Sequence, residues 1–425
     1  MWQFWVDRGG TFTDIVARKP DGALRTHKLL SENPEQYKDA AVQGIRDLMG
    51  LKGDDAFPKA GIQAVKMGTT VATNALLERK GDPTLLMITE GFGDLLRIGY
   101  QNRPGLFDLH IQLPELLYCD VAEVPERLAA DGSVITTLDR DAARKSLQAA
   151  YDKGLRGVAI AFMHGYLNPE HEIAVADIAR EIGFTQISTS HETSRLVKLV
   201  GRGDTTVVDA YLSPILRRYV EQVAGALDVA GGACERIFFM QSNGGLTDAN
   251  LFQGRDAILS GPAGGVVGMV KTAEQAGFDR LIGFDMGGTS TDVCHYAGSY
   301  ERSFETEVAG VRMRAPMMNI HTVAAGGGSI LTFRDGRYQV GPESAGANPG
   351  PACYRRGGPL TVTDCNVLLG KLNPDHFPAV FGPDADEKLD VETVRQQFTD
   401  IAADIARETG AEPLSPEDTA EGFLK

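Results

Sequence analysis

The chain has 425 residues, of which 43% are hydrophobic and 23% are charged, and its formal net charge is −15 at pH 7. This length exceeds one ordinary core and predicts two or three domains, while the acidic balance argues against nucleic acid and anionic membranes as partners. The sequence contains no run of about 18 apolar residues, so it predicts no membrane span. Five scattered cysteines without a CxxC pair indicate a reducing cytoplasm.

The first part of the chain alternates strand-like and helix-like segments. Residues 13–18 and 24–30 are predicted to form a hairpin, because Asp21-Gly22 suits its turn. Alternation of this kind indicates a mainly parallel α/β sheet. Further strands are predicted at 4–6, 64–67, 84–89, 157–163 and 186–189, and helices at 35–48, near 74–80, 92–96, 140–153 and 170–182.

The second part begins, by our prediction, near residue 195, which divides the chain into domains 1–195 and 196–425. A long helix over 203–227 with a bend at Pro214 is followed by a strand at 236–240 and a helix from about 260 to 276. Segment 321–370 is rich in glycine and proline, which favours irregular backbone packed near a site over a flexible loop. Residues 420–425 read as helix without a stop signal, so we expect the fold to be incomplete at this end.

One octapeptide occurs twice. Asp7-Arg8-Gly9-Gly10-Thr11-Phe12-Thr13-Asp14 returns as Asp285-Met286-Gly287-Gly288-Thr289-Ser290-Thr291-Asp292, identical at six of eight positions. Each copy follows a short apolar run that reads as a strand. A chance match of this kind is expected on the order of once in 10⁷ positions. The repeat therefore predicts two similar halves of one fold, each presenting a glycine- and threonine-rich turn to a shared ligand.

The residues of this motif suit phosphate. Paired glycines let the backbone approach a ligand closely, successive N–H groups form an anion-binding nest, and threonine hydroxyls add donors. An aspartate at the strand end would repel phosphate unless it holds Mg²⁺ or orients a nucleophile. A tight hairpin with a purely structural turn remains the alternative, and it is weaker for two copies than for one. Neither a GxxxxGK[ST] loop nor a Rossmann GxGxxG is present.

The paired motifs resemble the two phosphate hairpins of the actin/sugar kinase/Hsp70 superfamily. More narrowly, residues 7–14, 67–78, 259–268, 284–293 and 341–354 resemble the hydantoinase A/5-oxoprolinase family, and Arg8 together with residues 101–109 resembles its 5-oxoprolinase branch. This resemblance implies an α/β fold of two related actin-like (ribonuclease H-like) lobes, with mixed sheets flanked by helices and a nucleotide cleft between them. The family's later glycine-rich adenosine segment is expected beyond residue 425.

The resemblance also implies a reaction and its participants. A cyclic amide, best represented by 5-oxo-L-proline, is opened with ATP and water to give L-glutamate, ADP and phosphate, after phosphorylation of the lactam oxygen. Mg²⁺ is the expected metal, K⁺ is a further candidate, and a hydantoinase B-like subunit or domain is the expected partner within a homo-oligomer. Two alternatives stay open: an ATP-dependent hydantoinase or ketone carboxylase subunit, and a non-catalytic nucleotide-binding or assembly subunit.

Candidate site residues follow from the motifs. Asp7 and Asp285 are predicted to be the catalytic and metal-binding carboxylates. Arg97 and Arg103 are weaker candidates for binding a substrate carboxylate, as are Thr69, Thr70 and Asn74 at a strand-to-helix junction, where an ordinary N-cap is the alternative. The predicted nucleotide-binding residues are Gly9, Gly10, Thr11, Thr13, Gly287, Gly288, Thr289, Thr291 and the cleft-lining Gly326, Gly327 and Gly328.

Overall fold

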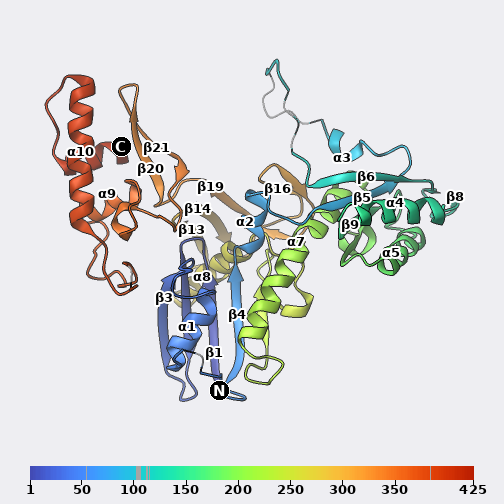
Figure 1. Ribbon diagram of the computed structural model, residues 1–425, viewed down its shortest axis with the longest axis horizontal. Helices are drawn as coiled ribbons and strands as arrows, with labels where there is room; N and C mark the ends of the chain where they lie inside the picture. Colours follow the sequence, from blue (N-terminus) through green and yellow to red (C-terminus); the bar gives the residue numbers. More distant parts are fainter. Residues whose placement is uncertain (54, 102–106, 112, 114, 383) are drawn as a thin grey trace.

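A computed structural model describes residues 1–53, 55–101, 107–111, 113, 115–382 and 384–425. It is a mixed α/β structure in which several sheets are flanked by helices, as the sequence predicts (Figure 1). The described residues contain no helix long and apolar enough to cross a membrane. All five cysteines are free thiols.

The first lobe is built on a six-stranded sheet in the order β12-β11-β4-β1-β2-β3. Antiparallel β1–β2–β3 carry the first motif, and β4 and β11 run parallel to β1 on its other side. Phe4 and Val6 are buried in the core, under helix α1. The elements are β1 (Trp2–Arg8), β2 (Phe12–Arg18), β3 (Leu24–Leu30), α1 (Ala40–Met49), β4 (Ile62–Thr69), α2 (Val71–Leu77), β11 (Ile237–Met240) and β12 (Leu246–Asp248).

Helix α1 begins five residues later than predicted. Asp39 accepts a hydrogen bond from the backbone N–H of Val42 at 3.0 Å and so caps the helix. The helix ends at Met49 and is capped by Gly50, whose φ of 74° is the left-handed conformation that glycine adopts without strain. The predicted start at residue 35 overlooked this aspartate as a stronger start signal.

A four-stranded parallel sheet forms a separate layer, in the order β10-β9-β5-β6. Every residue of β5 and β9 is buried, because helices cover both faces of the sheet. The elements are β5 (Thr84–Thr89), α3 (Leu95–Ile98), β6 (Tyr118–Val124), the ribbon β7 (Arg127–Leu128) with β8 (Val134–Thr136), α4 (Arg140–Asp152), β9 (Gly157–Ala161), α5 (Glu170–Ile182), β10 (Gln186–Thr189) and α6 (Ser190–Thr193).

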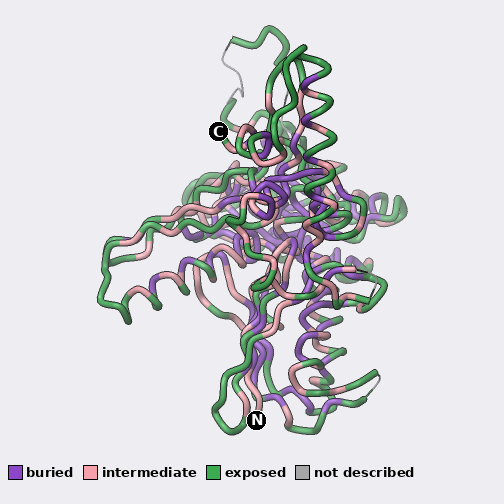
Figure 2. The backbone as a smooth tube through the Cα atoms, turned by 90° about the vertical axis from the view of Figure 1, so that its left-hand side faces the viewer, coloured by how far each residue is buried: buried purple, intermediate pink, exposed green. Residues whose placement is uncertain are grey.

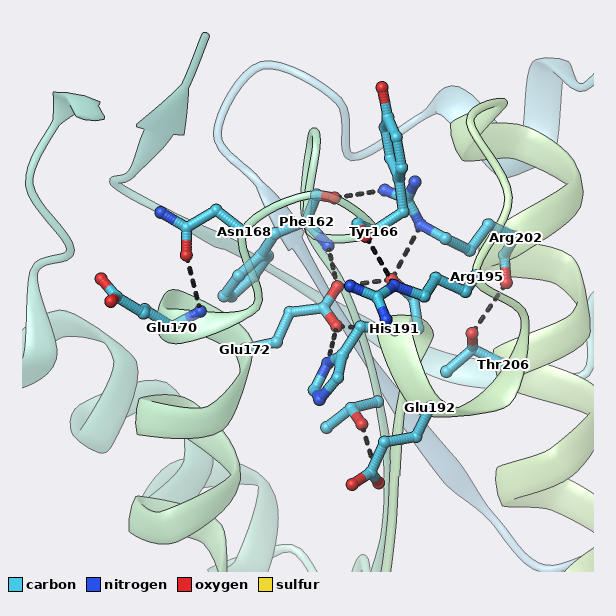
Figure 3. Close-up of polar contacts among 12 residues, drawn as sticks. Phe162, Tyr166, Asn168, Glu170, Glu172, His191, Glu192, Arg195, Arg202 and Thr206 are labelled. Atoms are coloured by element: carbon cyan, nitrogen blue, oxygen red, sulfur yellow. Dashed lines mark hydrogen bonds and ion pairs between the residues drawn. The ribbon is translucent and has the colours of Figure 1, made fainter. Parts of the chain in front are cut away.

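Helix α7 (Leu199–Ala226) packs on this layer and is tied to it by a buried polar network (Figure 3). The Arg202 side chain is fully buried; its Nε donates to Ser190 Oγ at 2.8 Å, and its Nη2 donates to the Phe162 carbonyl. Glu172, also fully buried, accepts from the backbone N–H of Phe162 at 2.9 Å and pairs with His191 Nδ1 at 2.6 Å. Because all these groups are partnered, the network fixes the sheet to α7 without unpaired buried charge.

The second lobe follows α8 (Ser260–Gln275) and carries the second motif in a three-stranded antiparallel sheet, β13-β14-β19. Beyond it, a hairpin and three helices pack around a separate apolar cluster that includes Phe381 and Phe398. Figure 2 shows that buried residues lie inside these layers and that projecting turns are exposed. The strands are β13 (Arg280–Met286), β14 (Thr291–Ala297), β15 (Arg302–Ser303), β16 (Thr306–Val308), β17 (Val311–Met313), β18 (Met317–Met318), β19 (Ile320–Val323), β20 (Ser329–Arg334) and β21 (Arg337–Ser344). The helices are η1 (Ala249–Leu251), η2 (Gly254–Asp256), η3 (Ala352–Tyr354), α9 (Val362–Leu368), α10 (Val391–Thr409) and α11 (Pro416–Leu424).

Candidate functional site

The two octapeptides form the same kind of hairpin turn. In the first, Asp7 lies opposite Asp14, and the N–H of Gly9 donates to the carbonyl of Phe12 at 3.0 Å. In the second, Asp285 lies opposite Asp292, and the equivalent bond runs from Gly287 to Ser290 at 2.9 Å. The sequence repeat is thus a structural repeat, with the paired carboxylates on one face of each hairpin.

The two turns face each other. A Cβ atom on Gly288 would lie 2.2 Å from Thr11 Oγ1, and one on Gly10 would lie 3.6 Å from Thr289 Oγ1. The first threonine of each motif therefore faces the second glycine of the other. Thr11 Oγ1 is buried and has no hydrogen-bond partner among the described residues, which leaves this donor free for a ligand between the turns.

The second threonine of each motif braces its own turn. The hydroxyls of Thr13 and Ser31 are 3.0 Å apart, and Ser31 Oγ donates to the carbonyl of Gly9 at 2.7 Å. Thr291 Oγ1 donates to the carbonyl of Ala325 at 2.6 Å. Both threonine side chains are buried. The structure thus separates two roles that the sequence prediction had combined, since Thr13 and Thr291 hold backbone rather than face the opposite turn.

The glycine run 326–328 packs against the backbone of the second turn and bonds to it. The N–H of Gly327 donates to the carbonyl of Gly287 at 2.9 Å, and the N–H of Gly328 donates to that of Gly288 at 2.7 Å. A Cβ on Gly326 would lie 2.8 Å from Gly287 O and from two backbone atoms of Gly288. Glycine is therefore required here for close backbone approach.

Asp7 is surrounded by backbone. Cβ atoms on Gly68 and Gly261 would lie 3.4 Å and 3.7 Å from Asp7 Oδ1. Gly68 is the last residue but one of the parallel strand β4, and Gly261 lies in the first turn of α8, where Ser260 Oγ accepts from the N–H of Thr69 at 3.1 Å. Sequence reasoning did not include Gly68, Ser260 and Gly261 in the site, although both segments are glycine-containing junctions that open a helix.

This crowding changes the protonation of Asp7. Its carboxylate keeps access to solvent, but the protein atoms packed around it, followed by the charges of Asp14 and Asp285, raise its pKa to about 6. Lys28 opposes the rise and pairs with Asp14 at 2.7 Å. Burial likewise raises the pKa of Asp292, against a hydrogen bond from Thr322.

Carboxylates gather here without forming a preformed metal cage. The described residues contain no group of three or more histidine, cysteine, aspartate or glutamate side chains placed to hold a metal ion. Mg²⁺ is commonly held by one or two carboxylates, with water and substrate phosphates completing its shell. Asp7 and Asp285, whose charges interact across the two turns, fit that mode.

The weaker candidates lie in two places. Thr70 is next to the paired turns; its Oγ1 donates to the carbonyl of Arg8 at 3.4 Å, and it is the N-cap of α2 without a capping side-chain bond. Thr69 Oγ1 accepts from the N–H of Val71 at 3.2 Å, and Asn74 is exposed on α2. Arg97 lines a separate cavity of about 600 Å³ with Asp204 and Arg312. Arg103 lies outside the described residues.

Together, these features define a two-lobed α/β protein in which paired Gly-Gly-Thr hairpins, each led by an aspartate, are held face to face. The chain belongs to the hydantoinase/oxoprolinase family: the model for the hydantoinase/oxoprolinase N-terminal region matches residues 3–183, and the hydantoinase/oxoprolinase model matches residues 202–425. The two matches leave residues 184–201 between them, and β11 and β12, which follow this interval in the sequence, belong to the sheet of the first lobe.

Similar proteins support this membership. A 5-oxoprolinase from Arabidopsis thaliana, 5-oxoprolinase 1, is 44% identical over 99% of the chain. The nucleotide-free structure of an acetone carboxylase matches with a TM-score of 0.79 at 25% identity, and an ATP-dependent caprolactamase from Pseudomonas jessenii matches with 0.74 at 32% identity, each over 99% of the chain. The chain spans 36% of the Arabidopsis relative and 60% and 61% of the two solved chains.

Proposed function

We propose that this chain is the phosphate-binding part of an ATP-dependent cyclic amide hydrolase, and that 5-oxo-L-proline is its substrate. The products are L-glutamate, ADP and phosphate. The similarity to a 5-oxoprolinase over nearly the whole chain supports the substrate, and the similarity to two proteins described as ATP-dependent supports the use of ATP. We further propose a cytoplasmic homo-oligomer that includes a hydantoinase B-like subunit or domain.

The face-to-face arrangement of the turns carries this proposal. Backbone N–H groups around Gly9–Gly10 and Gly287–Gly288, with the hydroxyls of Thr11 and Thr289, would grip the β- and γ-phosphates of ATP from two sides. Positioning and charge neutralisation are most of what phosphoryl transfer requires of a protein. The unpartnered hydroxyl of Thr11 is the observation that best distinguishes a ligand site from a merely structural pair of hairpins.

Asp7 and Asp285 would hold Mg²⁺ or orient water. When bound, the metal supplies positive charge that stabilises the transferring phosphoryl group. With a pKa of about 6, Asp7 is mostly ionised above neutral pH, where it accepts hydrogen bonds from water. Thr13, Thr291 and Gly326–Gly328 keep both turns in shape, and Arg97 remains a candidate for the substrate carboxylate. K⁺ is part of the proposal as a charge-balancing cation.

Two measurements test the proposal. Calorimetric titration with ATP·Mg²⁺ asks whether the chain binds nucleotide, and Thr11→Val should weaken binding whereas Thr13→Val should not. A coupled assay for ADP release, run on a protein that includes the remaining family polypeptide, compares 5-oxoproline, hydantoin, and acetone with bicarbonate. Release with 5-oxoproline alone is the expected result. If neither the chain alone nor the protein with the remaining family polypeptide binds ATP, the assignment of ATP as the ligand is refuted and an assembly role is left.

One alternative has specific support. The likeness to acetone carboxylase, at a TM-score of 0.79, makes a ketone carboxylase subunit the second candidate. In that case ADP release would depend on acetone and bicarbonate together, and 5-oxoproline would have no effect. The hydantoinase alternative predicts release with hydantoin.

A further inference from the structure

A cavity of about 600 Å³ lies apart from the two hairpin turns, and no residue of either octapeptide lines it. Four segments that are distant in the sequence contribute to its walls: α3, the residues at the start of β6, α7, and the β16–β17 hairpin (Figure 1). Helix α7 packs on both α3 and β17, so it holds the two sides of the cavity together. Cavities of this size are typical of sites for small organic molecules.

The inner walls of the cavity are apolar. Leu96, Leu117, Val207 and Val311 line it, and all four side chains are buried in the main hydrophobic core. Because these side chains are fixed by packing within the core, the shape of this part of the cavity does not depend on a ligand. Such walls favour a ligand with an apolar body, since contact with them removes apolar surface from water.

Three polar groups line the same cavity and keep bonding capacity that the described residues do not use. The guanidinium of Arg97 has no ion pair among these residues, and the hydroxyl of Tyr118 has no hydrogen bond among them. Asp204 Oδ2 accepts from Arg312 Nε at 3.0 Å, whereas Oδ1 of the same carboxylate accepts from no described residue. One cation, one hydroxyl and one carboxylate oxygen are therefore available to a ligand.

The three groups lie close enough together to act on a single small molecule. Burial raises the pKa of Tyr118, the charge of Asp204 raises it further, and the charge of Arg97 lowers it. Burial also raises the pKa of Asp204 to about 6, although Arg312 opposes the rise. An N–H group bonded to the free oxygen of Asp204 would satisfy a largely desolvated acceptor.

The other charged side chains of the cavity do not neutralise Arg97. Glu115 pairs with Arg79 at 3.3 Å, and Asp204 is engaged by Arg312. Glu307 is exposed and pairs with no cation among the described residues. The cavity thus offers one guanidinium to an anion, and its carboxylates offer acceptors to an N–H group.

We propose that this cavity binds a small organic acid that has a largely apolar body and an amide group. The ligand's carboxylate would pair with Arg97, its amide N–H would donate to Asp204 Oδ1, and its carbonyl would accept from Tyr118. This class of ligand follows from the cavity, whereas the choice of 5-oxo-L-proline, which carries all three groups, as the probe rests on the proposed function. Because the cavity is separate from the two turns, binding there should not require ATP.

Calorimetric titration without nucleotide tests the site. 5-Oxo-L-proline should bind at least about tenfold more tightly than two compounds of similar size. The first, 2-pyrrolidinone, lacks the carboxylate, and the second, cyclopentanecarboxylate, lacks the amide. Each loses hydrogen bonds to a charged side chain of the cavity, which accounts for a difference of this size.

Substitutions connect the binding to the cavity. Arg97→Gln should weaken the binding of 5-oxo-L-proline about tenfold or more and leave that of 2-pyrrolidinone unchanged, because only the first compound has a carboxylate. Tyr118→Phe should weaken the binding of both lactams about threefold. Arg140→Gln is the matched control, since Arg140 is also an exposed arginine on a helix but does not line the cavity. A melting curve for each variant confirms that it is folded.

Three outcomes overturn the proposal. The folded chain binds none of the three compounds, or it binds cyclopentanecarboxylate as tightly as 5-oxo-L-proline, or Arg97→Gln binds 5-oxo-L-proline as tightly as the unmodified chain. In the last case, a loss in Thr11→Val instead would place the compound at the turns and leave the proposed function intact. Binding in the expected pattern by a chain that does not bind ATP would support the cavity site and refute the ATP assignment, so the two proposals fail separately.

Discussion

The contact between the two turns makes Gly288→Ala the most informative substitution. The added methyl group would lie 2.2 Å from Thr11 Oγ1 and 3.1 Å from Thr11 Cβ, whereas ordinary contacts begin near 3.4 Å. Rotating the Thr11 side chain removes only the first overlap. Without a change of the Thr11 rotamer the turns would have to separate by roughly 1 Å, and with that change the contact with Thr11 Cβ still requires a shift of a few tenths of an ångström.

Either adjustment should weaken the proposed binding of phosphate, because both turns contribute to it. Overpacking of this size costs about 1–3 kcal/mol, which corresponds to a loss of about 5- to 140-fold in the affinity for ATP·Mg²⁺ at about 1.4 kcal/mol per tenfold. The neighbouring Gly287→Ala is the matched control, because its methyl group would meet nothing closer than Ser290 O at 3.5 Å. Removing the opposing side chain, in the double variant Gly288→Ala/Thr11→Gly, should relieve the overlap and recover the part of the loss that is steric.

Calorimetric titration of the three variants measures this pattern, and a melting curve for each confirms that the fold is intact. Equal affinities in Gly288→Ala and the unmodified chain would show that the turns do not need their present spacing to hold a nucleotide. An equal loss in Gly287→Ala would show that any side chain in the motif disturbs binding, so that the contact between Gly288 and Thr11 is not the cause of the loss.

Other predictions use the same site. Asp7→Asn should abolish ADP release yet raise the melting temperature at pH 7.5. The pKa of Asp7 is about 6 in the folded protein and 3.8 ordinarily, so the native state loses stability as the pH rises from about 4 to about 6. The rise in melting temperature caused by the substitution should therefore be smaller at pH 5. Thr13→Val should lower stability by about 1 kcal/mol through loss of the bond to Ser31, whereas Thr11→Val should leave stability unchanged and weaken ATP binding; thermal and calorimetric measurements that gave the reverse pattern would exchange the two roles. Gly326→Ala should destabilise the second turn, because its Cβ meets only backbone at 2.8 Å; an unchanged melting temperature would contradict this.

The sequence predicted a helix or strand correctly where the residues of that element alone determine its type and its ends. Strand Thr84–Thr89, helix Glu170–Ile182 and strand Gln186–Thr189 begin and end where predicted, because each has a continuous apolar or amphipathic pattern and a clear boundary. In the glycine-rich segment that was predicted to be irregular, Gly327 and Gly328 do lie against a motif, whereas Ser329–Arg334 and Arg337–Ser344 form the β20–β21 hairpin. The start of α1 was misplaced because an apolar pattern alone does not reveal which polar residue caps a helix.

What the sequence could not supply was the relation between distant segments. Nothing in the motif distinguishes Thr11 from Thr13, since both are threonines in a turn, and only packing against Gly288 and Ser31 separates them. The crowding of Asp7 depends on Gly68 and Gly261, which lie far from it along the chain. Arg97 was predicted to bind a substrate carboxylate from its residue type, and the sequence could not show that it lines a cavity separate from the two turns.

The two motifs are alike in sequence but unequal in their surroundings. Asp7 lies near the end of β1, which is paired on both edges, and β4 places Gly68 opposite it, where the lack of a side chain leaves space for the carboxylate. Asp285 lies near the end of β13, which pairs only with β14 among the described residues. Equal sequence therefore does not give the two aspartates equal neighbours, because the pairing of β4 with β1 places Gly68 beside the first of them.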